Sequence, residues 1–341
     1  MPTKVGNGGY SQENYDPTTG RYVKAGTSSD VKYYNLGFNW DDIEDEYDNI
    51  DFNPTNNNVN SNQNDYEELK KYLSDNVNLI GNASKEKFEK LLNDISQADE
   101  KSIQRVNNFF KTDFGKSISI EFSKNNSGKG RETKTYWSPI IRILRFQDTN
   151  DARAFFHEVG HAMNSYIAIK NNKSALSVET SKYNDIFKNI KSQEKNNDFN
   201  GIDNFVKDFA SMLNIPEIKH CYDFYKTMHF LGANSMPQKV EEKYVNSNYA
   251  SICSKNKGLI AGVSDFISSL TDGEIHLGFG HSKNYWEMGE DNPLDEFFAN
   301  MNAYSAAKNE NIIEFVKKHY PVLVNGYKEI INDIDKTFGG N

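Results

Sequence analysis

One short stretch decides the interpretation of this chain: His157-Glu158-Val159-Gly160-His161. In a helix, residues four apart lie on one face, about one turn from each other, so both imidazoles can reach a single metal ion. The glutamate between them can then act on a water molecule at that ion. The alternative is a surface helix whose two histidines have no function.

The neighbouring residues predict that this stretch lies within a long helix. Residues 148–151 are acidic or cap-forming, as a helix N-terminus prefers. Phe156, Val159, Met163 and Ile167 then recur at helical spacing and form an apolar stripe. The two histidines are therefore expected beside that stripe, at the edge of a core.

The composition indicates a folded, acidic protein. The chain has 341 residues, 37% of them hydrophobic and 13% aromatic, which suffices for one large domain or two ordinary ones. Its net charge is -9 without a long basic run, so nucleic acid is not expected as a partner. Cys221 and Cys253 could form one disulfide, but they are predicted to be small buried hydrophobic residues.

Neither a signal peptide nor a membrane span is expected. The first ten residues lack the apolar run of a signal peptide, and no stretch approaches membrane-spanning length. We therefore expect a protein that is cytoplasmic, virion-associated or exported by a non-classical route.

The pattern along the chain predicts an α+β fold, mostly helical, with a small β-sheet beside the His157 helix. Residues 1–65 are expected to be a flexible Asn/Gly-rich tail, residues 66–114 a helical layer, and residues 115–338 the main domain. In the tail, residues 15–23 have turn chemistry between aromatics. The aromatic cluster at 33–40 would dock on the body or on a partner, or would be only transiently ordered.

The strands and the remaining helices follow from the same periodicities. Leu69, Leu73 and Val77 predict the first helix of the helical layer, while 117–122 and 136–146 are expected to be a pair of strands. Pro139 within the second strand suits an edge or a bulge. Residues 165–260 are predicted to be mostly helical. No ligand is assigned there, and the region's histidines, His220 and His229, are interpreted as hydrogen-bonded or exposed.

A catalytic zinc site needs a third protein ligand, and Glu296 is the best candidate. Asn292 and Pro293 are a natural N-cap and first helical residue, so Glu296 falls in the first turn of a new helix. Ala299 and Ala303 would let this helix pack closely on the His157 helix. The alternative is that Glu296 only complements the helix dipole.

The segment before that helix offers a hydrogen-bond donor for an oxyanion. Residues 273–286 are rich in glycine, histidine and aromatic residues. Tyr285 is the favoured donor and His281 the next, because peptide hydrolysis develops negative charge on the carbonyl oxygen. The competing interpretation is a loop in which both residues are structural.

These motifs resemble those of the gluzincin class of zinc metallopeptidases, which pairs His-Glu-x-x-His with a downstream glutamate. The run Asp295-Glu296-Phe297-Phe298-Ala299-Asn300 is similar to the third-ligand helix of the anthrax lethal factor peptidase domain, where a second acid stands in place of Asn300. In that family a tyrosine shortly before the ligand helix assists the oxyanion, and Tyr285 is the nearest match. The order of motifs from Gly280 onward also resembles zinc-peptidase-like domains of phage minor-head and mobile-element proteins.

The resemblance implies a zinc-dependent endopeptidase. His157, His161 and Glu296 would bind Zn²⁺, and Glu158 would be the general base for a zinc-bound water that attacks a protein or peptide substrate. One alternative is a phage- or mobile-element-associated structural or effector protein, toxin-like, in which catalysis is incidental or absent. Another is a binding module whose tail recruits a partner.

Overall fold

The computed structural model describes most of the chain beyond residue 62. The described residues are 63–124, 135–148, 151–170, 192, 199–231, 247–271, 273, 275–278, 281, 285–286 and 292–338, together with four short strands before residue 25. The chain divides into two compact units, Met1–Ile43 and Glu44–Asn341. Among the described helices, none combines the length and apolar character needed to cross a bilayer.

The first unit contains two antiparallel strand pairs. β1 (Lys4–Val5) pairs with β2 (Gly9–Tyr10), and β3 (Glu13–Asp16) pairs with β4 (Arg21–Lys24). The second pair sets Tyr15 opposite Tyr22, and residues 17–20, where turn chemistry was noted, lie outside the described residues. The aromatic cluster at 33–40 lies outside the described residues.

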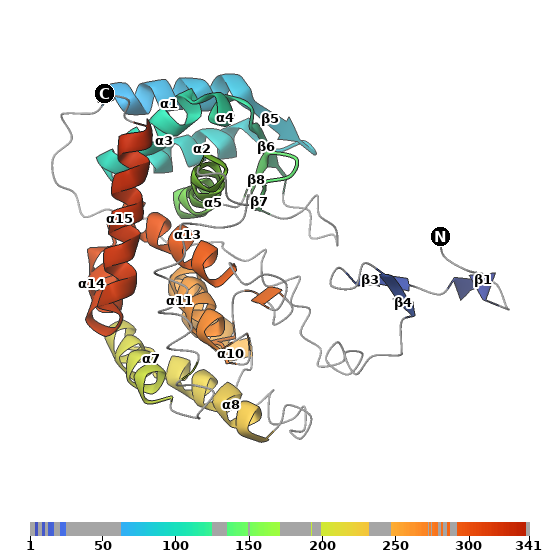
Figure 1. Cartoon of the computed structure of the whole chain (residues 1–341), viewed down its shortest axis with the longest axis vertical. Helices are drawn as coiled ribbons and strands as arrows, with labels where there is room; N and C mark the ends of the chain where they lie inside the picture. The colour runs from blue at the N-terminus through green and yellow to red at the C-terminus, as the bar shows by residue number, and fades with distance from the viewer. Residues whose placement is uncertain are drawn as a thin grey trace. The chain divides into compact units, whose positions relative to one another are not determined.

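The second unit contains a small four-stranded mixed sheet on one side of its helices (Figure 1). Its strands are β5 (Val77–Ile80), β6 (Ser119–Ser123), β7 (Tyr136–Ser138) and β8 (Ile143–Gln147), in the spatial order β5-β6-β8-β7. β5, β6 and β8 are parallel, and β7 is an antiparallel edge strand. Alternation along β6 buries Ile120 and Phe122, as predicted for a half-buried strand.

One strand prediction was wrong. The expected single strand at 136–146 is split into β7 and β8 by a turn at residues 139–142. The strand expected at 117–122 is present as β6, and it pairs with β8 in parallel. Arg142 has φ 51°, a left-handed conformation that reverses the chain. Ile140 and Ile141 lie on this turn and are 92% and 60% exposed. Because both are apolar, the sequence pattern resembles one continuous strand.

The start of the sheet was also assigned incorrectly. Val77 was placed on a helical stripe, but helix α1 (Gln63–Asn76) ends just before it and Val77 begins β5. Strand β5 then pairs in parallel with β6, which lies more than forty residues further along the chain. Such a distant partner leaves no trace in local periodicity.

Among the described residues, three further helices lie between α1 and the His157–His161 motif, in the stretch predicted to be a helical layer or at its end. α2 (Lys85–Ser96), α3 (Glu100–Lys111) and α4 (Asp113–Lys116) follow α1. Each of these three helices has an N-cap side chain that accepts the backbone N–H three residues further on. The N-cap residues are Ser84, Asp99 and Thr112. Phe109 and Phe110 of α3 are buried, so this helical layer is part of the hydrophobic core.

The remaining helices make the protein mostly helical, so the predicted α+β class with a small sheet is confirmed. They are α5 (Ala152–Lys170), α7 (Asn200–Leu213), α8 (Glu217–Leu231), α10 (Ser247–Cys253), α11 (Lys257–Leu270), α13 (Asn292–Ala306), α14 (Glu310–His319) and α15 (Pro321–Phe338). α5 lies against β7 and β8, and α13 packs on both α5 and α11 (Figure 1).

Small residues let α13 approach its two neighbours closely. A Cβ on Gly160 of α5 would lie 3.2 Å from the Cα of Ala299, which confirms the predicted close packing at Ala299. Asn302 also donates from Nδ2 to the carbonyl oxygen of Phe156, at 2.6 Å. These contacts fix α13 against the part of α5 that carries the two histidines.

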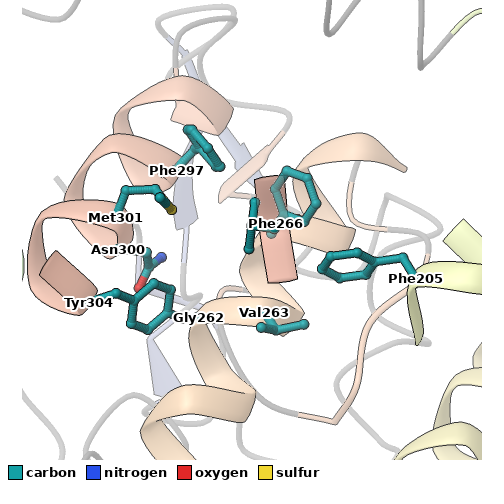
Figure 2. Close-up of a pocket in the computed structure, with 9 residues that line it drawn as sticks. Phe205, Gly262, Val263, Phe266, Phe297, Asn300, Met301 and Tyr304 are labelled. Carbon is teal, nitrogen blue, oxygen red and sulfur yellow. The ribbon is translucent and has the colours of Figure 1, made fainter. Parts of the chain in front are cut away.

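A different face of α13 meets α11 across a small, mostly apolar pocket (Figure 2). Phe266, Phe297 and Met301 line it, together with Asn300 and Tyr304. At its edge, a Cβ on Gly262 would lie 2.0 Å from the Tyr304 hydroxyl oxygen, so the Tyr304 side chain would have to move to accommodate any other residue at that position.

Candidate metal centre

Helix α5 brings the two motif histidines together, as their spacing predicts. Asp151 caps the helix by accepting the N–H of Ala154 on Oδ1, at 3.1 Å. The Nε2 atoms of His157 and His161 lie 3.2 Å apart, and His157 is 7% exposed. Both rings therefore present the same nitrogen to one point at the edge of the core.

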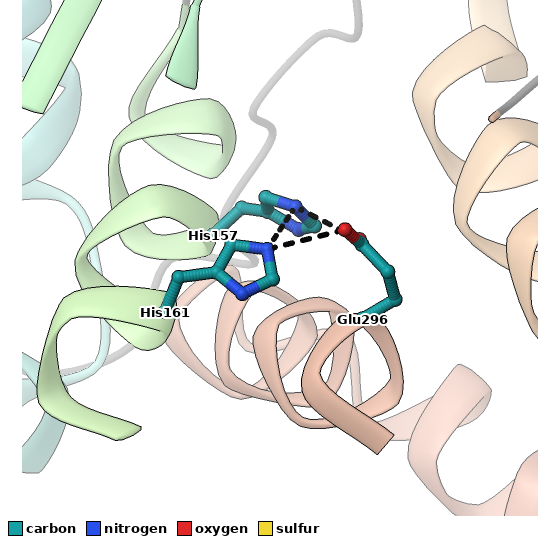
Figure 3. A group of neighbouring side chains, drawn as sticks. All are labelled: His157, His161 and Glu296. Carbon is teal, nitrogen blue, oxygen red and sulfur yellow. Dashed lines mark hydrogen bonds and ion pairs between the residues drawn. The ribbon is translucent and has the colours of Figure 1, made fainter. Parts of the chain in front are cut away.

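Glu296 of α13 faces that point (Figure 3). Its Oε2 lies 3.4 Å from His157 Nε2, and its Oε1 lies 3.4 Å from His161 Nε2. Nitrogen and oxygen ligands at 2.0–2.1 Å around a tetrahedral Zn²⁺ are separated by roughly 3.3 Å. These separations are of that size, and one potential ligand atom from each of the three side chains lies within 4.8 Å of the other two, so the three residues could hold one ion.

The burial of Glu296 supports the same conclusion. Its side chain is 2% exposed, and Oε2 has no hydrogen-bond partner within the described structure. A buried carboxylate oxygen without a hydrogen bond is costly unless a cation compensates it. His157, His161 and Glu296 thus form a buried group that could hold a metal ion.

The charges in this group are strongly coupled. Burial lowers the pKa of His157 to about 4 despite the nearby Glu296 carboxylate. Burial also disfavours the charged form of His161, but the negative charge of Glu296 outweighs it and raises the pKa of His161 to about 9. Burial also disfavours the ionised form of Glu296, yet His281 and His161 hold its pKa well below the usual range. The carboxylate therefore stays ionised, as a metal ligand must.

Glu158 lies on α5 between the two histidines and has the environment of a base. Burial raises the pKa of its carboxyl to about 7, although the backbone of Trp137 donates a hydrogen bond to it. Trp137 belongs to the edge strand β7, and its Nε1 donates to Ser165 Oγ of α5 at 2.9 Å. The edge strand is thereby anchored directly beside Glu158.

Tyr285 and His281 both reach Glu296 Oε1. The Tyr285 hydroxyl donates to this oxygen at 2.6 Å, and His281 Nε2 lies 3.1 Å from it. The two rings are stacked with centroids 3.9 Å apart. Burial and the nearby Glu296 raise the pKa of Tyr285 well above its usual value, so its hydroxyl keeps its proton. Both predicted donors therefore lie beside the candidate ligands.

Several supporting residues were not predicted from the sequence. Asn164 of α5 donates a short hydrogen bond from Nδ2 to Asp295 Oδ1, next to Glu296. Asp265 of α11 is fully buried and accepts the backbone N–H of His281 on Oδ1, at 2.8 Å. The only local signal for Asp265 is a carboxylate within a strongly apolar helix.

The other histidines and the cysteines agree with their predicted structural roles. His220 is exposed, and His229 packs edge-on against Phe199 with centroids 5.8 Å apart. Neither belongs to a group of metal-ligand side chains among the described residues. Cys221 and Cys253 are both buried and free, so the disulfide alternative is wrong.

Comparison with protein family models, with curated proteins and with solved structures finds no match for this chain. The resemblance to gluzincins therefore rests on the motif residues and on the site that they form.

Proposed function

We propose that this protein is a zinc-dependent endopeptidase of the gluzincin type. The observation that carries the proposal is the convergence of His157, His161 and Glu296 at tetrahedral spacing, with Glu158 beside them. Two imidazoles and a carboxylate are a donor set typical of catalytic zinc, which leaves one position open for water or substrate. When bound, the ion would polarise a carbonyl group and lower the pKa of a water molecule.

Glu158 is the proton-transfer group of the proposed reaction. Its pKa of about 7 allows the carboxylate to take a proton from water at neutral pH and to return it to the departing amine. Its position between the two histidines sets it next to the candidate ligands without being one of them. The reaction breaks the C–N bond of a peptide and adds the elements of water.

Tyr285 is the proposed oxyanion donor. Its hydroxyl is protonated, buried and already within the site, where it donates to Glu296 Oε1. A preorganised donor of this kind stabilises the negative charge that develops on the attacked carbonyl oxygen. His281, stacked on Tyr285, is the alternative donor.

The proposed substrate is a polypeptide bound in extended form. β7 is one of the two edge strands of the sheet, and Trp137 in it contacts Glu158. An extended peptide that pairs with such an edge would have its backbone alongside Glu158. The phage, mobile-element or toxin setting rests on the motif resemblance alone.

The experiment combines metal analysis with a peptide-library cleavage assay on the full chain. The wild type should contain zinc and cleave peptides, and Glu158→Gln should keep zinc and lose cleavage. His161→Ala should lose both. Wild-type protein that binds zinc but cleaves no peptide would favour the alternative of a structural or effector protein. Full activity of Glu158→Gln would refute the assignment of the base.

A further inference from the structure

We infer that Asp265, His281 and Glu296 form a second cation site that shares Glu296 with the first. One potential ligand atom from each of these three side chains lies within 4.8 Å of the other two. The inference rests on the proposed metal centre, because Glu296 is common to both groups. It adds a two-metal arrangement bridged by one carboxylate.

The geometry of Glu296 suits a bridging role. Its Oε2 faces His157 at 3.4 Å, whereas its Oε1 lies 3.1 Å from His281 Nε2. His281 is thus on the side of the carboxylate away from His157, and it does not join the His157 group. Oε1 also lies 3.4 Å from His161 Nε2. A bridging Glu296 would bind the first ion through Oε2, which faces His157, and the second ion through Oε1, as in co-catalytic metal pairs about 3.5–4 Å apart.

Charge also favours a cation between Asp265 and Glu296. Asp265 is fully buried and Glu296 is 2% exposed, so neither carboxylate is screened by water. Two buried carboxylates whose oxygens lie within 4.8 Å of each other repel, and a divalent ion bound by both would offset this repulsion. Two carboxylate oxygens and one imidazole nitrogen are a donor set that suits Zn²⁺.

Helix packing holds Asp265 in place for this role. Gly262 and Asp265 are three residues apart and therefore lie on the same face of α11. That face meets α13, where a Cβ on Gly262 would collide with the Tyr304 hydroxyl. The absence of a side chain at Gly262 lets α11 lie close to α13 beside Tyr304. Glu296 precedes Tyr304 by about two turns of α13, and Asp265 lies close to it across the two helices.

The segment that carries His281 is held independently of any cation. Ser264 Oγ accepts the N–H of Leu277 at 2.8 Å, and the Tyr249 hydroxyl donates to the carbonyl oxygen of Leu277 at 2.9 Å. Asp265 then accepts the N–H of His281 itself. Leu277 and the backbone of His281 are thus held before a second ion binds, which lowers the entropic cost of binding.

The second ion would tie three separate elements together. It would join α11, α13 and His281. Tyr285 would then be held near the first ion by two contacts, its own hydrogen bond to Glu296 and its stacking on the coordinated His281 ring. The second site is therefore expected to support the position of the proposed oxyanion donor.

The test is the zinc stoichiometry of the full chain, measured by equilibrium dialysis against Zn²⁺ followed by elemental analysis. The wild type should bind two equivalents, and His281→Ala and Asp265→Asn should each bind one. Asp265→Asn keeps an oxygen that can accept the His281 N–H, so the segment should remain folded. Ser264→Ala is the matched control, since it removes a neighbouring anchor of the same segment without removing a ligand. It should bind two equivalents.

The outcomes separate this inference from the proposed function. One equivalent in the wild type, unchanged in His281→Ala, would overturn the second site and leave the first intact. A second equivalent that persists in both His281→Ala and Asp265→Asn would be adventitious surface binding and would also overturn it. Absence of zinc from the wild type would overturn both proposals. If Asp265→Asn fails to fold, His281→Ala alone decides.

Discussion

Replacement of Gly160 by alanine tests how closely α5 and α13, the helices that carry the candidate metal ligands, are packed. The new Cβ would lie 3.2 Å from the Cα of Ala299 and 3.4 Å from Asn302 Nδ2. Carbon atoms prefer about 3.5–4.0 Å, so α13 must retreat by a few tenths of an ångström. Ala299 and Asn302 are both buried, which leaves little room for that movement.

The expected magnitude follows from comparison with a glycine that has open space. A Cβ on Gly201, in the first turn of α7, would meet nothing within 4 Å. Both replacements gain helix propensity, up to about 1 kcal/mol. Only Gly160→Ala also carries the cost of overpacking, typically about 1–3 kcal/mol. Gly160→Ala should therefore be less stable than Gly201→Ala by about 1–3 kcal/mol.

The assay is urea unfolding followed by circular dichroism, in the presence of a chelator so that metal binding does not contribute. Zinc affinity measured separately should fall in Gly160→Ala, because retreat of α13 carries Glu296 away from both histidines. It should be unchanged in Gly201→Ala. Equal stabilisation of the two variants, with equal zinc affinity, would refute the proposed packing of α5 on α13.

The other predictions concern the reaction, the support of the ligands and the contribution of metal to stability. Glu158→Gln should lower kcat by about 10²–10⁴-fold or more while zinc content stays constant, as checked by steady-state kinetics and elemental analysis. Asn164→Ala removes a buried donor to Asp295 and should cost about 1–3 kcal/mol in unfolding free energy, whereas an effect below 0.5 kcal/mol would contradict that hydrogen bond. Saturating zinc at about 100 times its Kd should stabilise the wild type by about 2.7 kcal/mol per site, and a chelator should reverse this shift in Tm. No zinc-dependent shift in the wild type would argue against a site formed in the folded state.

Local sequence patterns predicted the parts of the site that lie within single helices. The spacing of His157 and His161 fixes their common face, because helix geometry alone determines it. Glu296 was found from the need for a third ligand and from a capped helix that carries a carboxylate in its first turn. In both cases the relevant information is contained in a few consecutive residues.

The features that were missed depend on contacts between distant segments. Val77 continues a helical stripe, and only its pairing with β6 makes it a strand residue. Asn164 and Asp295 are 131 residues apart, and Asp265 meets His281 through a backbone N–H. Ile140 and Ile141 led to the prediction of a strand where there is a turn, because exposed apolar residues on a turn resemble the apolar residues of a strand.

The most direct test of the central claim is an anomalous-scattering crystal structure of the full chain, with data collected on both sides of the zinc absorption edge. The account predicts an anomalous peak within about 2.0–2.2 Å of His157 Nε2, His161 Nε2 and a carboxylate oxygen of Glu296. A zinc-loaded crystal with no peak between these three side chains, or with zinc bound only elsewhere, would contradict it.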